Sequence, residues 1–194
     1  MNSIFLFVAL SGGYLLGSIP FGLLLTKWAG LGDVRNIGSG NIGATNVLRT
    51  GNKKLAAATL LLDAVKGTLP FSSKAFFGRF VCHCSRARRV FGAFVPDLAG
   101  FKGGKGVATF AGISIGFSWH VFAPFALVWL LTALITRYSS LAALVGSVAA
   151  TAGLFWVNRF DLGYLFIVLT ALIFYKHRDN IKRLVAGTES KIGK

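Results

Sequence analysis

The sequence predicts an all-α integral membrane protein that folds as a compact, polytopic helical bundle. Hydrophobic residues make up 54% of the 194 residues, more than a typical soluble domain carries. The 21 basic residues far outnumber the 6 acidic ones, and they fall between apolar runs. This pattern indicates anionic lipid and anionic substrates rather than nucleic acid. At this length we expect residues 1–194 to form a single domain.

Six apolar segments follow one another along the chain. The first, from about Ile4 to Leu25, is long enough to cross about 30 Å of hydrocarbon. It lacks the basic start and the small-residue exit of a signal peptide, so we interpret it as an uncleaved span. Several others are shorter than about 20 residues, which favours tilted or re-entrant helices. The segments cover about 4–25, 55–71, 107–119, 121–136, 141–157 and 162–175.

The distribution of basic residues orients these segments. Lysine and arginine gather in 26–54, in 101–106 and in the tail that follows residue 175, and Arg137 stands between two apolar segments. The residues before the first apolar segment carry none. By the positive-inside rule the N-terminus is outside, and the basic loops and the tail are cytoplasmic.

Residues 72–100 conflict with this topology, because they must cross the membrane yet carry many charges. Each charge at mid-bilayer costs about 2.5–3.5 kcal/mol on insertion scales. If residues 81–100 are read one base out of frame, Phe91 to Gly100 can become Leu-Gly-His-Leu-Phe-Pro-Ile-Trp-Leu-Gly. Cys82 to Val90 can likewise become a run of Val, Ala, Ile, Leu and Phe, so the whole stretch is then apolar. We therefore hypothesise two compensating frameshifts, in the gene or in its sequencing, and seven intended spans. The charges concerned are Lys74, Arg79, Arg86, Arg88, Arg89 and Asp97.

Two glycine-rich loops are typical of anion binding. Glycine lets backbone N–H groups approach an oxyanion closely, and lysine adds a point charge. The dinucleotide fingerprint formed by the first loop lacks its preceding strand, and the second loop has glycine where a P-loop needs Ser or Thr. A flexible linker remains the alternative for the first loop. The candidate residues are Gly38, Ser39, Gly40, Asn41, Gly43, Thr45 and Asn46 in the first loop, and Lys102, Gly103, Gly104 and Lys105 in the second.

Two further pairs stand at helical i, i+3 spacing. Asp63 and Lys66 lie on one face of the second apolar segment, where either an interior ion pair or support of a site is possible. His177 and Asn180 follow the last apolar segment, and both can hydrogen-bond a hydroxyl substrate. Cys82 and Cys84 are too close for an easy disulfide and too few for structural zinc. We predict no metal site and no organic cofactor.

Several motifs together resemble the PlsY family, bacterial membrane acyltransferases that use acyl-phosphate and glycerol 3-phosphate. The resemblance covers nearly the whole chain except about 72–100, where Ala93-Phe94-Val95-Pro96 replaces the family's His-x-Phe-Pro. The shifted reading restores that motif. The matching stretches are Ser18 to Gly22, Asp33 to Arg49, Asp63-x-x-Lys66-Gly67, Phe101 to Thr109, Arg137 to Leu141, and His177 to Leu184.

The resemblance implies a reaction and a set of roles. A fatty acyl group would pass from acyl-phosphate to the 1-hydroxyl of glycerol 3-phosphate, giving lysophosphatidic acid and phosphate, the first acylation of phospholipid synthesis. Ser39 and the neighbouring glycine amides would hold the acyl-phosphate, and His177 and Asn180 would orient the hydroxyl. The phosphate of glycerol 3-phosphate would meet Arg49, Lys105 and Ser140.

The remaining expectations concern the location of the protein, its partner and the alternative functions. The resemblance implies a multi-pass protein of the bacterial cytoplasmic (inner) membrane, with its active-site loops cytoplasmic. A soluble acyl-phosphate-producing enzyme is the candidate partner. A transporter of a phosphorylated metabolite is the main alternative, although no inverted repeat is readable. The third reading is an acyltransferase that the frameshifted segment has inactivated.

Overall fold

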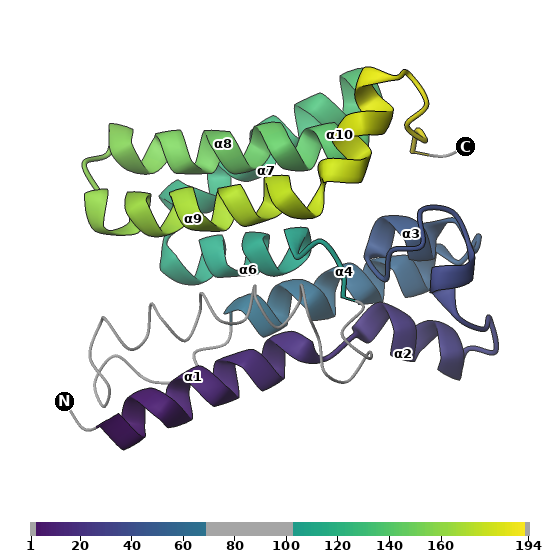
Figure 1. The fold of residues 1–194 in the computed structure, drawn as a ribbon, viewed down its shortest axis with the longest axis horizontal. Helices are drawn as coiled ribbons and strands as arrows, with labels where there is room; N and C mark the ends of the chain where they lie inside the picture. Colours follow the sequence, from purple (N-terminus) through teal and green to yellow (C-terminus); the bar gives the residue numbers. More distant parts are fainter. Residues whose placement is uncertain (1–2, 69–102, 193–194) are drawn as a thin grey trace. The chain divides into compact units, whose positions relative to one another are not determined.

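A computed structural model describes residues 3–68 and 103–192, which form helices and loops without a strand in those ranges (Figure 1). They belong to two compact units, residues 1–116 and 117–194, which are described in turn. The proposed frameshifted segment, its intended span, the cysteine pair and Lys102 lie outside the described residues. The expectation of one domain over residues 1–194 therefore stays a prediction.

The first unit contains five α-helices and one short 3₁₀ helix among its described residues. The helices are α1 (Ser3–Ser18), α2 (Phe21–Trp28), η1 (Val34–Asn36), α3 (Ala44–Leu48), α4 (Lys53–Thr68) and most of α6 (Val107–Phe117). Leu23, Val34, Ile42 and Val47 form a buried core that joins α2, η1 and α3, and Ala56 of α4 completes it. This core fixes the loop between α2 and α3 against the helices on either side of it.

The first apolar run, from about Ile4 to Leu25, forms two helices. The helix breaks after Ser18, and α2 starts at Phe21 with Pro20 in front of it. Proline has no N–H and its ring clashes with the preceding turn, which ends a helix. Lys66 of α4 donates a hydrogen bond of 2.9 Å to the carbonyl of Ile19, one of the acceptors at this break.

Lys66 also pairs with Asp63 on its own helix. The ammonium and the carboxylate are 2.6 Å apart, and both side chains are largely buried. The i, i+3 spacing therefore makes an interior ion pair, as one of the two readings of the sequence held. Through the bond to Ile19, the pair holds α4 against the junction between α1 and α2.

Helices α4 and α6 approach each other through glycine. A Cβ at Gly112 of α6 would overlap the carbonyl of Ala64, and a Cβ at Gly67 of α4 would overlap the carbonyl of Thr109. Only a residue without a side chain lets the two backbones come this close. The small residues therefore position α6, and with it the glycine-lysine loop that precedes it.

The second unit is a helical hairpin with a third long helix. Its helices are α7 (Trp119–Thr136), α8 (Ser139–Trp156), α9 (Phe160–Lys176) and the short α10 (Arg178–Val185). Helix α8 packs against both α7 and α9. A hydrogen bond of 2.9 Å between the hydroxyls of Thr151 and Thr170 joins α8 to α9. Helix α10 bends from α9 by 61° at His177.

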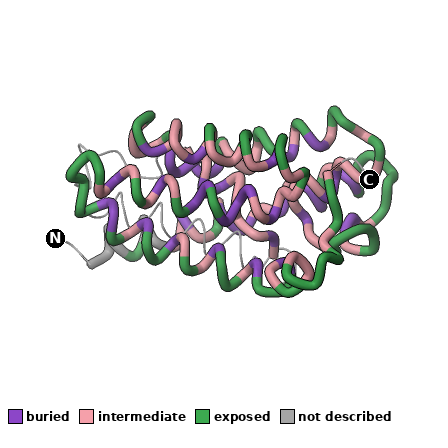
Figure 2. Tube along the Cα trace, turned by 90° about the horizontal axis from the view of Figure 1, so that it is seen from above, coloured by how far each residue is buried: buried purple, intermediate pink, exposed green. Residues whose placement is uncertain are grey.

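The hydropathy of the described helices fits a membrane protein. Two helices, α7 and α8, are long and apolar enough to span a bilayer, and α9 with α10 makes a third candidate as a bent pair. Exposed and buried positions alternate along the helices (Figure 2), and many of the exposed ones are large and apolar. The number of spans and their orientation stay predictions.

Candidate functional site

Asn46 organises the first glycine-rich loop. Its side-chain nitrogen lies within hydrogen-bond distance of three backbone carbonyls, those of Val34 at 2.8 Å, Ile37 at 3.1 Å and Asn41 at 2.7 Å. Its side-chain oxygen accepts from the backbone N–H of Ser39 at 3.0 Å. Asn46 is 1% exposed. The side chain is thus committed to the loop itself, and it stabilises a conformation that no regular ladder of hydrogen bonds supports.

Arg49 also contacts Asn46. One guanidinium nitrogen of Arg49 donates to the side-chain oxygen of Asn46 at 3.0 Å. Gly38 has a φ of +52°, and a Cβ there would come within 2.5 Å of Arg49 Cδ and of the Asn46 oxygen. Gly38, Ser39 and Arg49 are therefore brought together, and the glycine is required both for its backbone conformation and for space.

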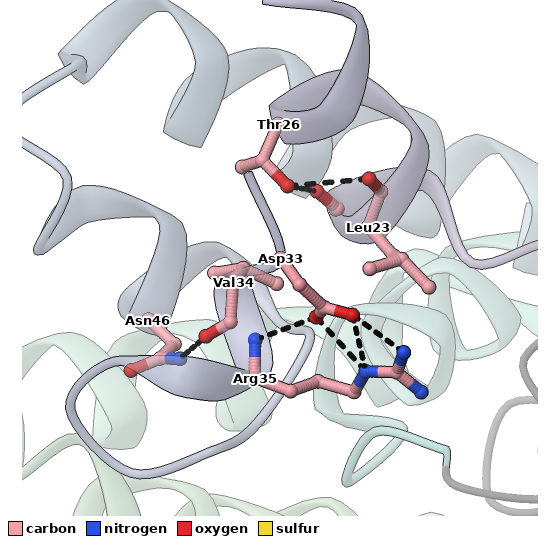
Figure 3. A network of polar contacts seen from close by, with 7 residues as sticks. Leu23, Thr26, Asp33, Val34, Arg35 and Asn46 are labelled. Atoms are coloured by element: carbon pink, nitrogen blue, oxygen red, sulfur yellow. Dashed lines mark hydrogen bonds and ion pairs between the residues drawn. The ribbon is translucent and has the colours of Figure 1, made fainter. Parts of the chain in front are cut away.

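The start of this loop is fixed by an ion pair, shown in Figure 3. Asp33 caps η1 by accepting from the backbone N–H of Arg35 at 3.0 Å and from the guanidinium of the same residue at 2.9 Å. These hydrogen bonds lower the pKa of Asp33 to about 2. The carboxylate is therefore ionised at every physiological pH, and the cap is permanent.

The second glycine-rich loop leads into α6. Gly104 is buried, Lys105 is half-buried, and Gly106 has a φ of +64°. The carbonyl of Gly106 accepts the first helical hydrogen bond, from Phe110 at 2.8 Å. Lys105 consequently stands two residues before a helix N-terminus, where backbone N–H groups and the helix dipole favour an anion.

In the second unit, His177 sits at the bend between α9 and α10 and is 2% exposed. Its Nδ1 lies 2.8 Å from the carbonyl of Ile173, one turn earlier. Because a carbonyl only accepts, Nδ1 carries the hydrogen. In the neutral ring the hydrogen on Nδ1 leaves the lone pair on Nε2.

Glu189 gathers the polar residues of this unit, and the sequence analysis did not single it out. One carboxylate oxygen accepts from the Ser140 hydroxyl at 2.8 Å and from the Asn180 amide nitrogen at 2.6 Å. The other accepts from Arg183 Nε at 2.7 Å. Burial acts to raise the pKa of Glu189, but these hydrogen bonds outweigh it and lower the pKa. Glu189 is therefore an ionised, largely buried carboxylate that accepts hydrogen bonds from Ser140, Asn180 and Arg183.

The chain reverses to bring Glu189 into place. Gly187 follows α10 with a φ of +70°, and the N–H of Thr188 bonds back to the carbonyl of Arg183. Farther on, the N–H of Ile192 donates to the carbonyl of Arg137 at 2.7 Å. The tail is thus fixed to the turn between α7 and α8, next to Ser140.

The predicted residues fall into two groups. Gly38, Ser39, Gly40, Asn41, Gly43, Thr45, Asn46, Arg49, Gly103, Gly104 and Lys105 belong to the first unit, whereas Ser140, His177 and Asn180 belong to the second. Within the second unit, Ser140 and Asn180 share one partner atom. Among the described residues there is no cluster of three or more metal-ligating side chains. The one signal for Glu189 was its isolation, since it is the only glutamate of the chain and stands in a basic tail.

Comparison with known proteins identifies the group to which this arrangement belongs. The sequence profile of the glycerol-3-phosphate acyltransferase family matches residues 7–187. Glycerol-3-phosphate acyltransferase of Brucella canis is 57% identical over 185 residues, covering 95% of this chain and 92% of the relative. That of Mesorhizobium japonicum is 56% identical over 188 residues, covering 97% and 96%.

Two solved structures are also similar. Both are crystal structures of PlsY (YgiH), an integral membrane glycerol 3-phosphate acyltransferase. The glycerol 3-phosphate form has a TM-score of 0.91 at 40% identity, covering 97% of this chain and 96% of that one. The lysophosphatidic acid form has a TM-score of 0.86 at 38% identity, covering 98% and 94%.

Proposed function

This chain belongs to the glycerol-3-phosphate acyltransferase family, and we propose that it takes its acyl group from an acyl-phosphate. The observation that carries the acyltransferase function is identity of 57% across 95% of the chain. The choice of donor rests on chemistry. An acyl-phosphate is a mixed anhydride, already activated, so positioning and charge stabilisation suffice for transfer. No nucleophile with an adjacent base is readable in the sequence.

We assign the two glycine-rich loops to the phosphates of the two substrates. Ser39 and the amides around Gly38 to Gly43 would hold the acyl-phosphate. Arg49, Lys105 and Ser140 would bind the phosphate of glycerol 3-phosphate. Asn46 lies within the same motif, but its hydrogen bonds favour a role in shaping the loop rather than in touching substrate.

The reaction itself needs one attacking oxygen and one leaving group. The 1-hydroxyl oxygen attacks the acyl carbonyl carbon, the bond from that carbon to the phosphate oxygen breaks, and the departing phosphate takes the hydroxyl proton. His177 and Asn180 would orient the hydroxyl. The products are lysophosphatidic acid and phosphate, and no metal or organic cofactor enters this scheme.

The membrane setting is proposed from the charge pattern. Seven spans, an outside N-terminus and cytoplasmic active-site loops would place the chain in the cytoplasmic membrane of a bacterium. The donor would then be delivered from the cytoplasm by a soluble enzyme that makes acyl-phosphate.

A donor comparison tests the proposal. Membranes that contain the chain as written, and in parallel a version with the shifted-frame segment, receive radiolabelled glycerol 3-phosphate with palmitoyl-phosphate or palmitoyl-coenzyme A. We expect lysophosphatidic acid from palmitoyl-phosphate alone. His177→Ala should reduce turnover by on the order of 10²-fold or more while the protein still inserts. Equal use of both donors would overturn the choice of acyl-phosphate, and normal turnover in the variant would remove His177 from the reaction.

A further inference from the structure

A pocket lies at the end of the second unit opposite α10 (Figure 1), beside the turn from α8 to α9. Its volume is about 240 Å³, and its lining residues come from α7, α8, α9 and the turns beside them. Three of them, Val121, Leu154 and Leu162, are buried and apolar. Along α8, Leu154 and Ser140 are roughly 21 Å apart at about 1.5 Å per residue. The pocket is therefore separate from the candidate site residues of this unit.

Arg159 supplies the positive charge of this pocket. Its side chain is exposed and pairs with Asp161, with Nε at 3.2 Å and Nη2 at 3.4 Å from the two carboxylate oxygens. Among the residues that the structure describes, Arg159 has no other side-chain partner. An ion pair this exposed holds its partners weakly. The guanidinium can therefore turn to a phosphate, which it binds through two parallel hydrogen bonds.

Ser118 and His120 line the same pocket from the start of α7. The Ser118 hydroxyl oxygen lies 3.1 Å from Nδ1 of His120. When this hydroxyl donates to Nδ1, the ring hydrogen lies on Nε2, where a phosphate oxygen can accept it. The pocket thus combines a guanidinium, an imidazole and a hydroxyl with a buried apolar surface.

Exposed aromatic side chains adjoin these lining residues along the chain. They are Trp119, Trp156, Phe160 and Tyr164. Exposed tryptophan and tyrosine are typical of the boundary between hydrocarbon and lipid headgroups. Helix α8 is roughly 27 Å long, close to the bilayer thickness of about 30 Å. The pocket therefore lies at the membrane surface opposite to the end of α8 that carries Ser140.

We propose that this pocket binds the headgroup of an anionic phospholipid from the leaflet on its side, with the lipid phosphate on Arg159. The glycerol backbone of the lipid would lie over Val121, Leu154 and Leu162, which a small soluble anion would leave in contact with water. A zwitterionic lipid fits less well, because its cationic group would meet the guanidinium. The inference concerns a lipid held away from the candidate site, and it does not depend on the acyl donor.

Quenching of tryptophan fluorescence by brominated lipid tests the proposal. The full chain, in whichever version inserts, carries phenylalanine at every tryptophan except Trp119 and Trp156, so that the two next to the pocket report alone. Nanodiscs contain phosphatidylcholine with a minor share of phosphatidylglycerol, and the bromine sits on the acyl chains of one lipid or of the other. We expect phosphatidylglycerol to be enriched about fivefold over its share, because one basic residue at an anionic membrane surface contributes a factor of this size.

Three variants separate the pocket from general attraction. Arg159→Gln should remove the enrichment. Arg178→Gln changes an exposed arginine at the other end of α9, so it is the matched control for net charge and should keep the enrichment. Asp161→Asn breaks the same ion pair but leaves the guanidinium, and it should keep or increase the enrichment.

The contrary outcomes are distinct. No enrichment in the unsubstituted protein, or an equal loss in Arg178→Gln, would mean that the pocket does not select the lipid. Loss in both Arg159→Gln and Asp161→Asn would show that the ion pair only supports the local fold, which overturns the proposal. If Arg159→Gln does not insert, Asp161→Asn and His120→Ala decide, since the enrichment must persist in the first and fall in the second.

Discussion

At the scale of single residues, Asn46 and Glu189 act alike. Each is a largely buried side chain whose hydrogen bonds are made to residues that the sequence had assigned to substrates. Asn46 holds Ser39 and Arg49, and Glu189 holds Ser140 and Asn180. Such supporting contacts lock the rotamers of the residues that we propose to meet the substrates, which is what precise positioning requires.

Gly38 gives a test of the first of these clusters. Gly38→Ala puts a Cβ against Arg49 and Asn46 at a φ of +52°, so both must move. We expect kcat/KM for glycerol 3-phosphate to fall by on the order of 10²-fold, as small displacements of a binding group can do. Gly51→Ala is the control, because its φ of +82° imposes similar backbone strain while no atom lies near the new Cβ. Equal activity of the two variants would mean that crowding at Gly38 does not matter.

The candidate site residues that the sequence predicted share one property, which is that their motifs are local. Ser39 and Asn46 lie in one glycine-rich run, and His177 and Asn180 are one turn apart. Glu189 meets Ser140 across 49 positions of the chain, after a reversal at Gly187. No local pattern encodes such a pairing, so its role became visible only in three dimensions.

At the scale of helices, close packing through glycine positions the elements. Gly112→Ala would force a Cβ onto the carbonyl of Ala64, and overpacking of this kind costs about 1–3 kcal/mol. In Gly153→Ala on α8 the new Cβ meets only Pro124, with Cγ at 3.4 Å and Cβ at 3.8 Å, which are ordinary contacts, and the helix gains about 0.5–1 kcal/mol of propensity. We expect the first variant to melt at a lower temperature in detergent and the second to match or exceed the unsubstituted protein. Similar melting of both would contradict the close approach of α4 and α6.

Helix positions were predicted better than helix breaks. The apolar runs after residue 106 correspond to α6, α7, α8 and α9, because hydropathy reports burial in lipid directly. The first run was interpreted as one span, and Pro20 lies inside it. Hydropathy summed over a window does not show this helix break, because the break depends on the one backbone N–H that Pro20 lacks. The carbonyl of Ile19 at the break accepts its hydrogen bond from Lys66 of another helix.

At the scale of the whole molecule, the charge pattern of 72–100 conflicts with the predicted topology. Six charged side chains stand where the alternation of basic loops demands a crossing: Lys74, Arg79, Arg86, Arg88, Arg89 and Asp97. At about 2.5–3.5 kcal/mol for each charge at mid-bilayer, this stretch inserts far less readily than an apolar span. The family's His-x-Phe-Pro motif is also missing there, and only the shifted reading supplies it.

We therefore predict that restoring the apolar reading of 81–100 raises both the amount of inserted protein and its turnover. The chain as written and the shifted version are expressed at equal transcript levels, and protein in the membrane fraction and lysophosphatidic acid formed are measured for each. We expect at least about tenfold more product from the shifted version, because removing even one mid-bilayer charge is worth more than 1.4 kcal/mol. Each version carries His177→Ala in a parallel sample, so that background acylation by the host membrane can be subtracted. Equal product from the two versions would show that the basic stretch is accommodated, and an unambiguous nucleotide sequence encoding it would then remove sequencing error as its origin.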